Sequence, residues 1–385
     1  MEAHHKRMKR VVLVAVFALA PLWATAASLK ALSLQATGGV TLAPGFSSSV
    51  TEYSAEVQSD ISALEVSALP EQDGALVSIT VNGQPTDSKT PRIAPLNTGR
   101  NVINIRAIDA STQSVRSYSV TVDRQDISAV VAKYLKLQFK DPDTGAVMPY
   151  RLFVPDGAKR SKSYPLVVFL HGGGERGNDN EKTLTANQGG TIWAMPKEQA
   201  KRQAFVLVPQ ARDSWDGGFG LTRGPDNKLS LARVFEPTQD IKVAHRLLMS
   251  VLDAYPNIDR KRLYVTGLSQ GGFGAWNWNI AHPELFAAVV AIAGGAEPSA
   301  VKVLKDKPAW AFHAASDPVI PVSYGRDTIA ALKAAGGQPR YTEYAADTYF
   351  YPMAHFSWVP AFRDTTMREW LFSQTQTLSQ SQTHR

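Results

Sequence analysis

The chain has 385 residues, of which 44% are hydrophobic and 19% are charged, and it contains 27 Gly and 23 Pro. This composition is typical of a folded globular protein of about two domains, and it excludes a disordered or collagen-like chain. The sequence has no cysteine, which excludes disulfides, thiolate zinc sites, iron–sulfur clusters and cysteine nucleophiles.

The positive charge of the chain is concentrated at its start. The formal net charge is +7, and residues 6–10 alone carry four basic side chains. An apolar run over residues 11–23 follows and ends at Ala24-Thr25-Ala26, and this run is shorter than the roughly 20 residues that a membrane-spanning helix needs. The pattern predicts a signal peptide over residues 1–26, and therefore an exported protein, periplasmic or extracellular, with no membrane span after cleavage. Cleavage removes nearly half of the excess charge, and the remainder is too small to predict a nucleic-acid partner.

Residues 27–124 have the alternating pattern of short β-strands. Val77, Ile79 and Val81, for example, place apolar side chains at every second position, so that one face of the strand is expected to be buried. Dipeptides such as Asn82-Gly83 mark reversals between strands. Similar alternation recurs around Ala55, Ile105 and Val120. About a hundred residues of this kind predict an all-β sandwich.

Particular positions extend this prediction to a family. They are Leu32-Ser33-Leu34, the Gly38-Gly39 turn, residues 42–46, Tyr53, residues 99–103 and residues 118–122. With these residues the segment resembles the cadherin-like, immunoglobulin-type β-sandwich module of exported bacterial proteins. The resemblance implies either a module that contacts polysaccharide or the cell envelope through residues 27–124, or a spacer. The segment has no histidine and no run of closely spaced acids, so no metal site is expected in it.

The pattern changes after a linker at residues 125–132. Continuous apolar runs alternate with segments of helical periodicity; the runs are residues 166–170, 205–208, 263–266, 288–292 and 309–313, and the helical segments are 238–254 and 327–335. Strands that are apolar at every position are buried on both faces of a sheet. Residues 133–372 are therefore predicted to form an α/β domain with a doubly wound, mostly parallel sheet. Residues 373–385 are nearly all Gln, Ser and Thr and are expected to form a disordered tail.

The most specific local motif follows the predicted strand 263–266. Gly267-Leu268-Ser269-Gln270-Gly271 is a G-x-S-x-G sequence, and its flanking strand and helix are those of a nucleophile elbow. Glycine on both sides allows a turn tight enough to expose Ser269 at the carboxyl edge of the sheet, near the N-terminus of the following helix. A glycine-rich turn with an incidental serine is the alternative. The context favours Ser269 as a nucleophile.

A serine nucleophile needs a general base and an acid that orients this base, and in this fold class both follow the serine in the chain. His355 is the candidate base because it lies in a loop before the last predicted helix. Asp317 is the candidate acid because it follows the predicted strand 309–313, and Asp347 is its alternative. Packing, capping or a place in the tail is expected for the remaining histidines after the serine, His282, His313 and His384.

Acyl transfer also needs backbone N–H groups that stabilise an oxyanion. One donor is expected from Gln270, which follows the serine, and the other from the glycine run after the predicted strand 166–170. Gly173 is the first choice in that run and Gly174 the second. The Gly-Lys-Ser/Thr ending of a phosphate-binding loop is absent. His171, just before the glycines, is expected to be structural.

Further motifs surround these candidate residues. They are residues 169–177, Pro209-Gln210-Ala211 with Trp215, residues 257–259, residues 317–321, and Trp358 after His355. With them residues 133–372 resemble the α/β-hydrolase superfamily, and within it the secreted esterases and predicted peptidases related to polyhydroxybutyrate depolymerases and feruloyl esterases. The resemblance implies a catalytic triad of Ser269, His355 and Asp317 that works without a cofactor.

The sequence as a whole predicts an exported serine hydrolase that cleaves carboxylic esters, free or linked to a polymer, through an acyl-enzyme. No cofactor or metal is expected. Trp215, Phe356 and Trp358 are expected to line the substrate pocket, whereas Trp276, on the helix after Ser269, is at least as consistent with core packing. Two alternatives remain: a serine peptidase with the same triad, and an envelope- or polymer-binding protein in which hydrolysis is secondary.

Overall fold

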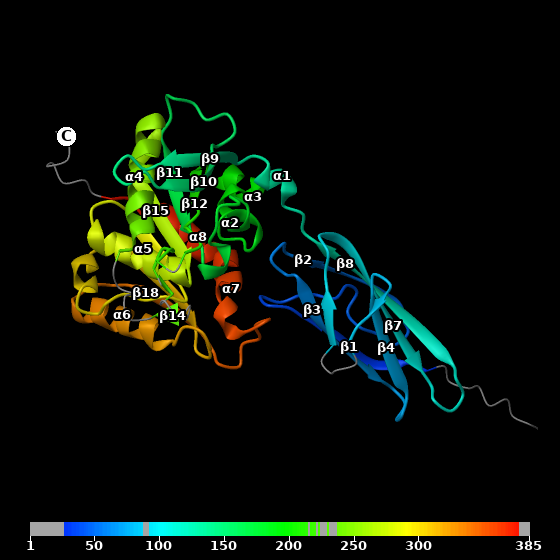
Figure 1. The fold of residues 1–385 in the computed structure, drawn as a ribbon. Coiled ribbons are helices and arrows are strands. Elements are labelled where there is room, and N and C mark those ends of the chain that lie inside the picture. Colours follow the sequence, from blue (N-terminus) through cyan, green and yellow to red (C-terminus); the bar gives the residue numbers. More distant parts are fainter. Residues whose placement is uncertain are drawn as a thin grey trace, which may run out of the picture.

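The computed structural model describes residues 27–87, 92–214, 216–220, 222–223, 229–230 and 237–376. The predicted signal peptide and residues 377–385 of the predicted tail lie outside these ranges. Two lobes follow one another along the chain: an all-β lobe, blue to cyan in Figure 1, and a larger lobe of helices and strands. The short helix α1 (Ser128–Val131) lies between them.

The first lobe is a sandwich of two β-sheets. Its strands are β1 (Leu29–Gln35), β2 (Glu52–Val57), β3 (Ala63–Pro70), β4 (Leu76–Val81), β5 (Gln84–Pro85), β6 (Arg92–Pro95), β7 (Gly99–Ile108) and β8 (Val115–Arg124). One sheet has the order β1-β3-β6 and the other β2-β8-β7-β4-β5, with β2 parallel to β8 and all other pairs antiparallel. Alternating side chains such as Ile79, Val81, Ile103 and Ile105 are buried between the sheets. The predicted all-β sandwich is confirmed.

The second lobe contains one eight-stranded sheet. Its strands are β9 (Leu135–Lys140), β10 (Val147–Phe153), β11 (Tyr164–Leu170), β12 (Phe205–Pro209), β15 (Ile258–Leu268), β16 (Ala288–Ile292), β17 (Ala309–Ala314) and β18 (Arg340–Tyr344). Their order is β18-β17-β16-β15-β11-β12-β10-β9; the pairs β9-β10 and β10-β12 are antiparallel and the others are parallel. The predicted doubly wound, mostly parallel sheet of an α/β-hydrolase is confirmed. β13 (Thr222–Arg223) and β14 (Leu229–Ser230) form a separate pair.

Helices cover both faces of this sheet (Figure 1). They are α2 (Lys182–Thr185), α3 (Pro196–Lys201), α4 (Gln239–Ala254), α5 (Gln270–Ala281), α6 (Ser323–Ala334), α7 (Trp358–Arg363) and α8 (Thr365–Ser373), with 3-10 turns η1 (Gly173–Glu175), η2 (Ile192–Ala194), η3 (Val301–Leu304) and η4 (Ala354–Phe356). Side chains of β11 alternate between the two cores: Leu166 and Val168 pack in the core that α4 and α5 cover, and Val167 and Phe169 in the core that α7 and α8 cover. The loops that follow the parallel strands therefore meet at one edge of the sheet, between the helical layers.

The helix α4 begins and packs as its sequence predicts. Thr238, the first residue of the predicted segment, is the N-cap, and its hydroxyl accepts a hydrogen bond from the N–H of Ile241 at 3.2 Å. Ile241, Ala244 and Leu248 are buried on one face of the helix. This apolar face fixes α4 against the sheet.

Three strands and the end of the chain differ from what the sequence predicts. β9, β10 and β18 were not predicted; β9 and β18 are the edge strands, and their exposed or half-buried side chains lack a continuous apolar run. The tail prediction is wrong for residues 373–376, because Ser373 ends α8 and the N–H of Gln376 donates to the carbonyl oxygen of Lys261 at 2.9 Å. Backbone hydrogen bonds, which the amino-acid composition of the segment does not indicate, hold residues 373–376 against the hydrolase domain.

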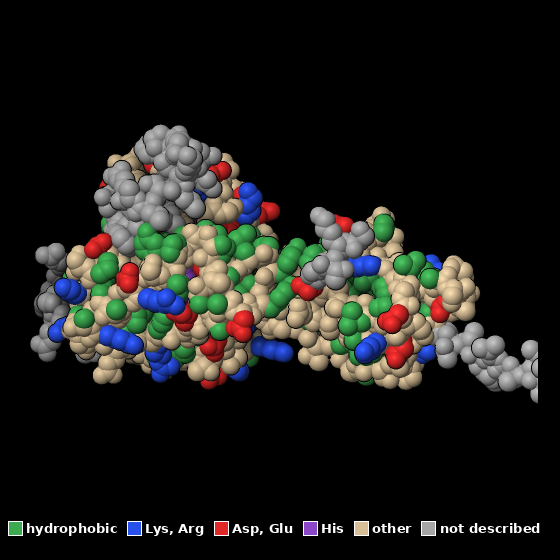
Figure 2. All heavy atoms as spheres, turned by 90° about the horizontal axis from the view of Figure 1, so that it is seen from below, with side chains coloured by type: hydrophobic (Ala, Val, Ile, Leu, Met, Phe, Trp, Pro, Cys, Tyr) green, Lys and Arg blue, Asp and Glu red, His purple; other side chains and the backbone are tan. Residues whose placement is uncertain are grey.

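The two lobes are joined by the linker and also by a shared hydrophobic cluster. One contiguous apolar cluster includes Ala36 and Ile61 of the sandwich together with Val359 and Phe362 of α7. On the face in Figure 2 the lobes meet at a narrow waist with hydrophobic side chains on both sides of it. In the part of the chain that the structure describes, no helix is both long and apolar enough to cross a bilayer.

Candidate active site

The G-x-S-x-G segment forms a sharp turn between β15 and α5. Ser269 has φ 52° and ψ −118°, a backbone conformation that residues with a side chain rarely adopt. A Cβ atom on Gly267 would overlap the carbonyl oxygen of Gly271, and a Cβ atom on Gly271 would overlap the carbonyl oxygen of Leu170. Only glycine fits on both sides, and the turn holds the Ser269 hydroxyl at the carboxyl end of β15.

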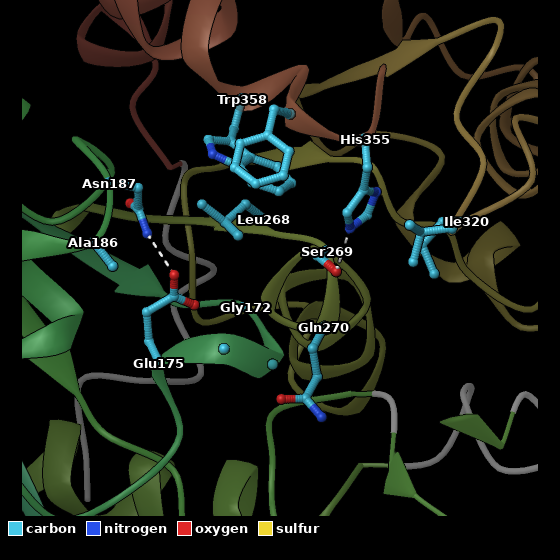
Figure 3. Close-up of a pocket in the computed structure, with 14 residues that line it drawn as sticks. Gly172, Glu175, Ala186, Asn187, Leu268, Ser269, Gln270, Ile320, His355 and Trp358 are labelled. Carbon is cyan, nitrogen blue, oxygen red and sulfur yellow. Dashed lines mark hydrogen bonds between the residues drawn. The ribbon is translucent and has the colours of Figure 1, made fainter. Parts of the chain in front are cut away.

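Three side chains from separate loops form one hydrogen-bonded chain. The Nε2 atom of His355, on η4, lies 3.0 Å from the Oγ atom of Ser269, as the dashed line in Figure 3 marks. The Nδ1 atom of His355 lies 2.8 Å from the Oδ2 atom of Asp317, in the loop after β17. The Asp317 side chain is fully buried and the His355 side chain is 9% exposed. The structure thus brings these three predicted site residues together.

Asp317 is held in place by neighbours besides His355. Its Oδ1 atom accepts hydrogen bonds from the backbone N–H groups of Val319, at 2.8 Å, and Ile320, at 2.9 Å. Burial raises the pKa of the Asp317 carboxyl, but hydrogen bonds from His313, His355 and Ile320 together outweigh burial and leave the pKa well below its usual range. The carboxyl is therefore ionised at neutral pH beside the imidazole of His355.

His313 contributes to this arrangement, although the sequence analysis assigned it only to packing or capping. It is fully buried in β17. Its Nε2 atom lies 3.0 Å from the carbonyl oxygen of Ile320 and 3.4 Å from the Oδ2 atom of Asp317. With the proton on Nε2, His313 donates to both oxygens. In the sequence, His313 lies at the end of a predicted strand and four residues before Asp317, and this position could have indicated its role.

The glycine run after β11 forms η1 beside Ser269. Gly173 and Gly174 line the same pocket as Ser269 and Gln270, and a Cβ atom on either glycine would meet nothing within 4 Å. A Cβ atom on Gly172, in contrast, would lie 2.7 Å from the side chain of Leu268. Gln270 is the first residue of α5, where the helix dipole favours negative charge. The predicted oxyanion residues therefore border the hydroxyl.

His171 holds the start of the glycine run. Its Nε2 atom accepts a hydrogen bond from the N–H of Ala211 at 3.0 Å, and its Nδ1 atom lies 2.6 Å from the carbonyl oxygen of Gly172. The neutral imidazole with its proton on Nδ1 satisfies both contacts. Burial is the main cause that lowers the pKa of His171 to about 4. These contacts assign His171 to the structure of the loop.

A cavity of about 270 Å³ opens beside the hydroxyl of Ser269. Leu268 and Trp358 form an apolar wall on one side, and Ile320 lies beyond His355 (Figure 3). Phe356 also lines the cavity, and its ring centroid lies 4.6 Å from that of Trp358. The ring of Trp358 meets the imidazole of His355 edge to face, with 5.0 Å between the ring centroids. The cavity therefore suits an apolar group placed next to the Ser269 hydroxyl.

Two family models match the chain. The cadherin-like beta sandwich domain matches residues 29–125, and the Esterase model matches residues 142–346, which is more than half of the chain. The chain belongs to the Esterase family. It is a carboxylic ester hydrolase with an α/β-hydrolase domain and a cadherin-like domain.

Solved structures include a similar enzyme. A thermostable esterase is 30% identical to this esterase; the match covers 79% of this chain and 91% of that chain, with a TM-score of 0.59. A ferulic acid esterase is 16% identical, with 62% and 99% covered and a TM-score of 0.43. Acylaminoacyl peptidase from Pyrococcus horikoshii is 14% identical, with 84% and 64% covered and a TM-score of 0.46. The last two likenesses are too distant to bear on the reaction.

The other residues that were singled out from the sequence lie partly in the pocket and partly away from it. Phe356 and Trp358 line the pocket, as described above, whereas Trp215 lies outside the described residues. Trp276 is fully buried in the core under α5. Asp347 is exposed, and Asp317 instead is the carboxyl at hydrogen-bond distance from His355. The ring of His282 stacks on that of His245, with 4.0 Å between centroids, and His384 lies outside the described residues.

Two polar residues of the pocket, Glu175 and Asn187, were not predicted from the sequence. The Nδ2 atom of Asn187 donates to the Oε1 atom of Glu175 at 3.2 Å (Figure 3). Burial raises the pKa of the Glu175 carboxyl. Glu175 directly follows the glycine run, but nothing in the sequence indicates that the distant Asn187 meets it. Among the described residues, no group of three or more His, Asp or Glu side chains is arranged to hold a metal ion.

Proposed function

We propose that the esterase is a serine hydrolase in which Ser269 is the nucleophile, His355 the general base and Asp317 the acid that orients this base. The observation that carries the proposal is the hydrogen-bonded chain from Asp317 through His355 to Ser269, which ends beside a pocket. Such a chain activates a hydroxyl group that is otherwise a weak nucleophile. The strained backbone at Ser269 is further support, since strain of this kind clusters at functional sites.

The first half of the proposed reaction forms an acyl-enzyme. The Oγ atom of Ser269 attacks the carbonyl carbon of the ester while its proton moves to the Nε2 atom of His355. The ionised carboxylate of Asp317 stabilises the resulting imidazolium and keeps the ring in position. When the tetrahedral intermediate collapses, the bond to the alcohol breaks and the alcohol leaves with the proton from His355.

The second half returns the enzyme to its starting state. A water molecule gives a proton to the Nε2 atom of His355 and attacks the acyl carbon, and the carboxylic acid leaves as Ser269 recovers its proton. In both halves the backbone N–H groups of Gln270 and Gly173 donate to the oxyanion, with Gly174 as the alternative to Gly173. The open space at Gly173 and the helix N-terminus at Gln270 support this assignment.

The proposed substrate is a carboxylic ester with an apolar group, either a small molecule or a group linked to a polymer. Leu268, Phe356 and Trp358 supply the apolar wall that such a group needs. We also propose that the esterase is exported, because residues 1–26 have the pattern of a signal peptide. The N-terminal sequence of the protein recovered from the periplasm or medium tests this: export by this signal predicts a start at Ala27.

Activity measurements on the chain from residue 27 onward test the reaction. We expect turnover of p-nitrophenyl butyrate with a burst of p-nitrophenol, and a loss of kcat of at least about 10⁴-fold in Ser269→Ala and His355→Ala. His282→Gln, outside the site, is the matched control for His355→Ala and should keep its activity. Ester turnover that survives Ser269→Ala would contradict the mechanism, and faster cleavage of peptide anilides than of esters would favour a peptidase.

A further inference from the structure

The segment that carries His355 touches the sandwich. Residues 345–353, between β18 and η4, form no helix or strand, and the segment continues through η4 into α7. Figure 1 shows it in orange, close to the ends of β1 and β2. Contacts from the sandwich therefore bear on where the imidazole of His355 lies.

The first contact joins Thr37 to Tyr351, four residues before His355. Thr37 follows β1 and is 1% exposed. Its Oγ1 atom accepts a hydrogen bond from the N–H of Tyr351 at 2.7 Å and donates to the carbonyl oxygen of Tyr351 at 3.3 Å. The Thr37 hydroxyl thus forms hydrogen bonds with both the N–H and the carbonyl group of Tyr351, in the segment that carries His355.

The second contact joins Asp60 to Arg363, the last residue of α7. The Nη2 atom of Arg363 forms an ion pair with the Oδ1 atom of Asp60, and its Nη1 atom donates to the carbonyl oxygen of Thr37 at 3.0 Å. The side chain of Asp60 is 4% exposed and that of Arg363 19%. A Cβ atom on Gly38 would lie 2.7 Å from Nη1, so the turn after β1 leaves room for the guanidinium. Breaking such a buried pair leaves an uncompensated charge.

The sandwich loop that carries Asp60, between β2 and β3, also contacts Gln188 of the hydrolase domain. The Nε2 atom of Gln188 lies 3.4 Å from both the Oε1 atom of Gln58 and the Oγ atom of Ser59. Gln188 follows Asn187, which lines the pocket. The loop itself is braced by Arg124, which donates to the carbonyl oxygen of Ser59 through Nε at 3.0 Å. One loop of the sandwich therefore contacts two segments that carry residues of the pocket.

We propose that the sandwich is a positioning domain of the active site, in which Thr37 and Asp60 hold the segment of His355 so that its imidazole stays within hydrogen-bond distance of Ser269. The proposal rests on the proposed role of His355 as the general base. Thr37 and Asp60 touch no reacting atom. They act through Tyr351 and Arg363, which lie on either side of His355 in the chain and fix the segment at two points.

The expected effect follows from the geometry of proton transfer. A general base works only within hydrogen-bond reach of the proton that it takes, and a displacement of about 1 Å lowers the rate by roughly a hundredfold. The segment between Tyr351 and Arg363 also carries Phe356 and Trp358 of the pocket, whereas Leu268, Ile320 and the glycine run lie outside it. Loosening these contacts should therefore lower kcat by a larger factor than it raises KM.

The test uses the full mature chain with single substitutions. We expect Thr37→Val, which keeps the shape but removes the hydroxyl, and Asp60→Asn each to lower kcat on p-nitrophenyl butyrate by roughly ten- to a hundredfold, with a smaller change in KM. The rate at which a p-nitrophenyl phosphonate modifies Ser269 should fall by the same factor, since this step also needs the base. Thr37→Ser, which keeps the hydroxyl, should restore most of the rate.

Tyr118→Phe is the matched control. It also removes a buried sandwich hydroxyl, but one that bonds to Leu29 and Ser48, at the opposite end of β1 from Thr37. We expect it to keep kcat. If Thr37→Val and Asp60→Asn both fold and keep the kcat of the wild type, the positioning role is overturned. An equal loss of kcat in Tyr118→Phe would overturn it as well. If Asp60→Asn does not fold, the kcat of Thr37→Val alone tests the proposal. Full activity in Ser269→Ala would instead overturn the proposed function.

Discussion

Histidine side chains of this esterase differ in role because their surroundings differ. His355 borders the pocket and has a carboxylate on one ring nitrogen and a hydroxyl on the other. His171 has two backbone partners and no access to solvent, and His313 is buried behind the carboxylate of Asp317. The residue type alone does not separate these roles, whereas burial and partners do.

Protonation of His171 should couple the stability of the fold to pH. Its pKa is lowered from 6.5 to about 4 in the folded protein, so between these values the unfolded chain binds a proton that the folded chain does not. The free energy of unfolding should therefore fall on acidification across this window, by up to about 1.4 kcal/mol per pH unit from this residue. Urea unfolding of the wild type and His171→Gln between pH 7 and pH 4.5, a range set by this window, measures the effect. Equal pH slopes in the two proteins would contradict it.

His313 should act on turnover through Asp317. His313→Phe keeps an aromatic ring but removes the donor to the Asp317 carboxylate, and a hydrogen bond to a charged group contributes about 1.5–3 kcal/mol. We expect kcat on p-nitrophenyl butyrate to fall about tenfold or more while KM stays within a factor of about two. His313→Gln, which keeps a side-chain donor, should lose less. A rise in KM at constant kcat would instead indicate a change in the pocket.

At the scale of elements, the packing of β11 and β15 against α5 sets the geometry at Ser269. Gly267 and Gly271 are needed because backbone atoms of the turn and of β11 occupy the space around them, whereas Gly173 and Gly174 face open space. Two kinds of glycine therefore stand close together in the site. One kind is required by close packing, and the other borders open space in the pocket.

Alanine at these glycines should separate folding from turnover. Gly271→Ala places a Cβ atom against the carbonyl oxygen of Leu170, and because both partners are backbone we expect a loss of stability of more than about 3 kcal/mol or an insoluble protein. Gly173→Ala meets no atom within 4 Å and should shift Tm by no more than a few degrees, while its methyl group narrows the pocket and lowers kcat/KM. Thermal melts and ester assays of both variants measure this. A stable, fully active Gly271→Ala would contradict the packing argument.

At the scale of the whole molecule, the sandwich and the hydrolase domain are coupled by a shared apolar cluster and by the buried pair of Asp60 and Arg363. Domains joined only by a linker move and unfold independently, whereas a large apolar interface opposes this. The sandwich therefore belongs to the same structural unit as the hydrolase domain.

Unfolding should accordingly be cooperative across both domains. We expect one endotherm in scanning calorimetry of the mature chain, with the loss of ester hydrolysis at the same temperature. Asp60→Ala, which leaves Arg363 unpaired in the interface, should lower Tm and separate the transition into two. Two well-separated endotherms in the wild type would show that the domains unfold independently.

Much of the fold was predictable from sequence because local patterns specify it. Alternating side chains indicate the sandwich, continuous apolar runs indicate the buried parallel strands, and both predictions are confirmed. Edge strands such as β9 and β18 were missed because a strand with one neighbour buries too little to need an apolar run. Local pattern reports burial, so elements with little burial escape it.

The candidate site, like the fold, was predictable from the sequence only in part. The turn at Ser269 is local, since two glycines around a serine between a strand and a helix already require it, and the sequence by itself therefore selected this residue. It also selected His355 and Asp317 as candidates by their places in the chain. Only the tertiary structure decided that His313 supports Asp317, that Asn187 meets Glu175, and that Thr37 and Asp60 hold the segment of His355. These contacts join residues brought together by packing of the sheet and of the two domains, and no local pattern encodes them.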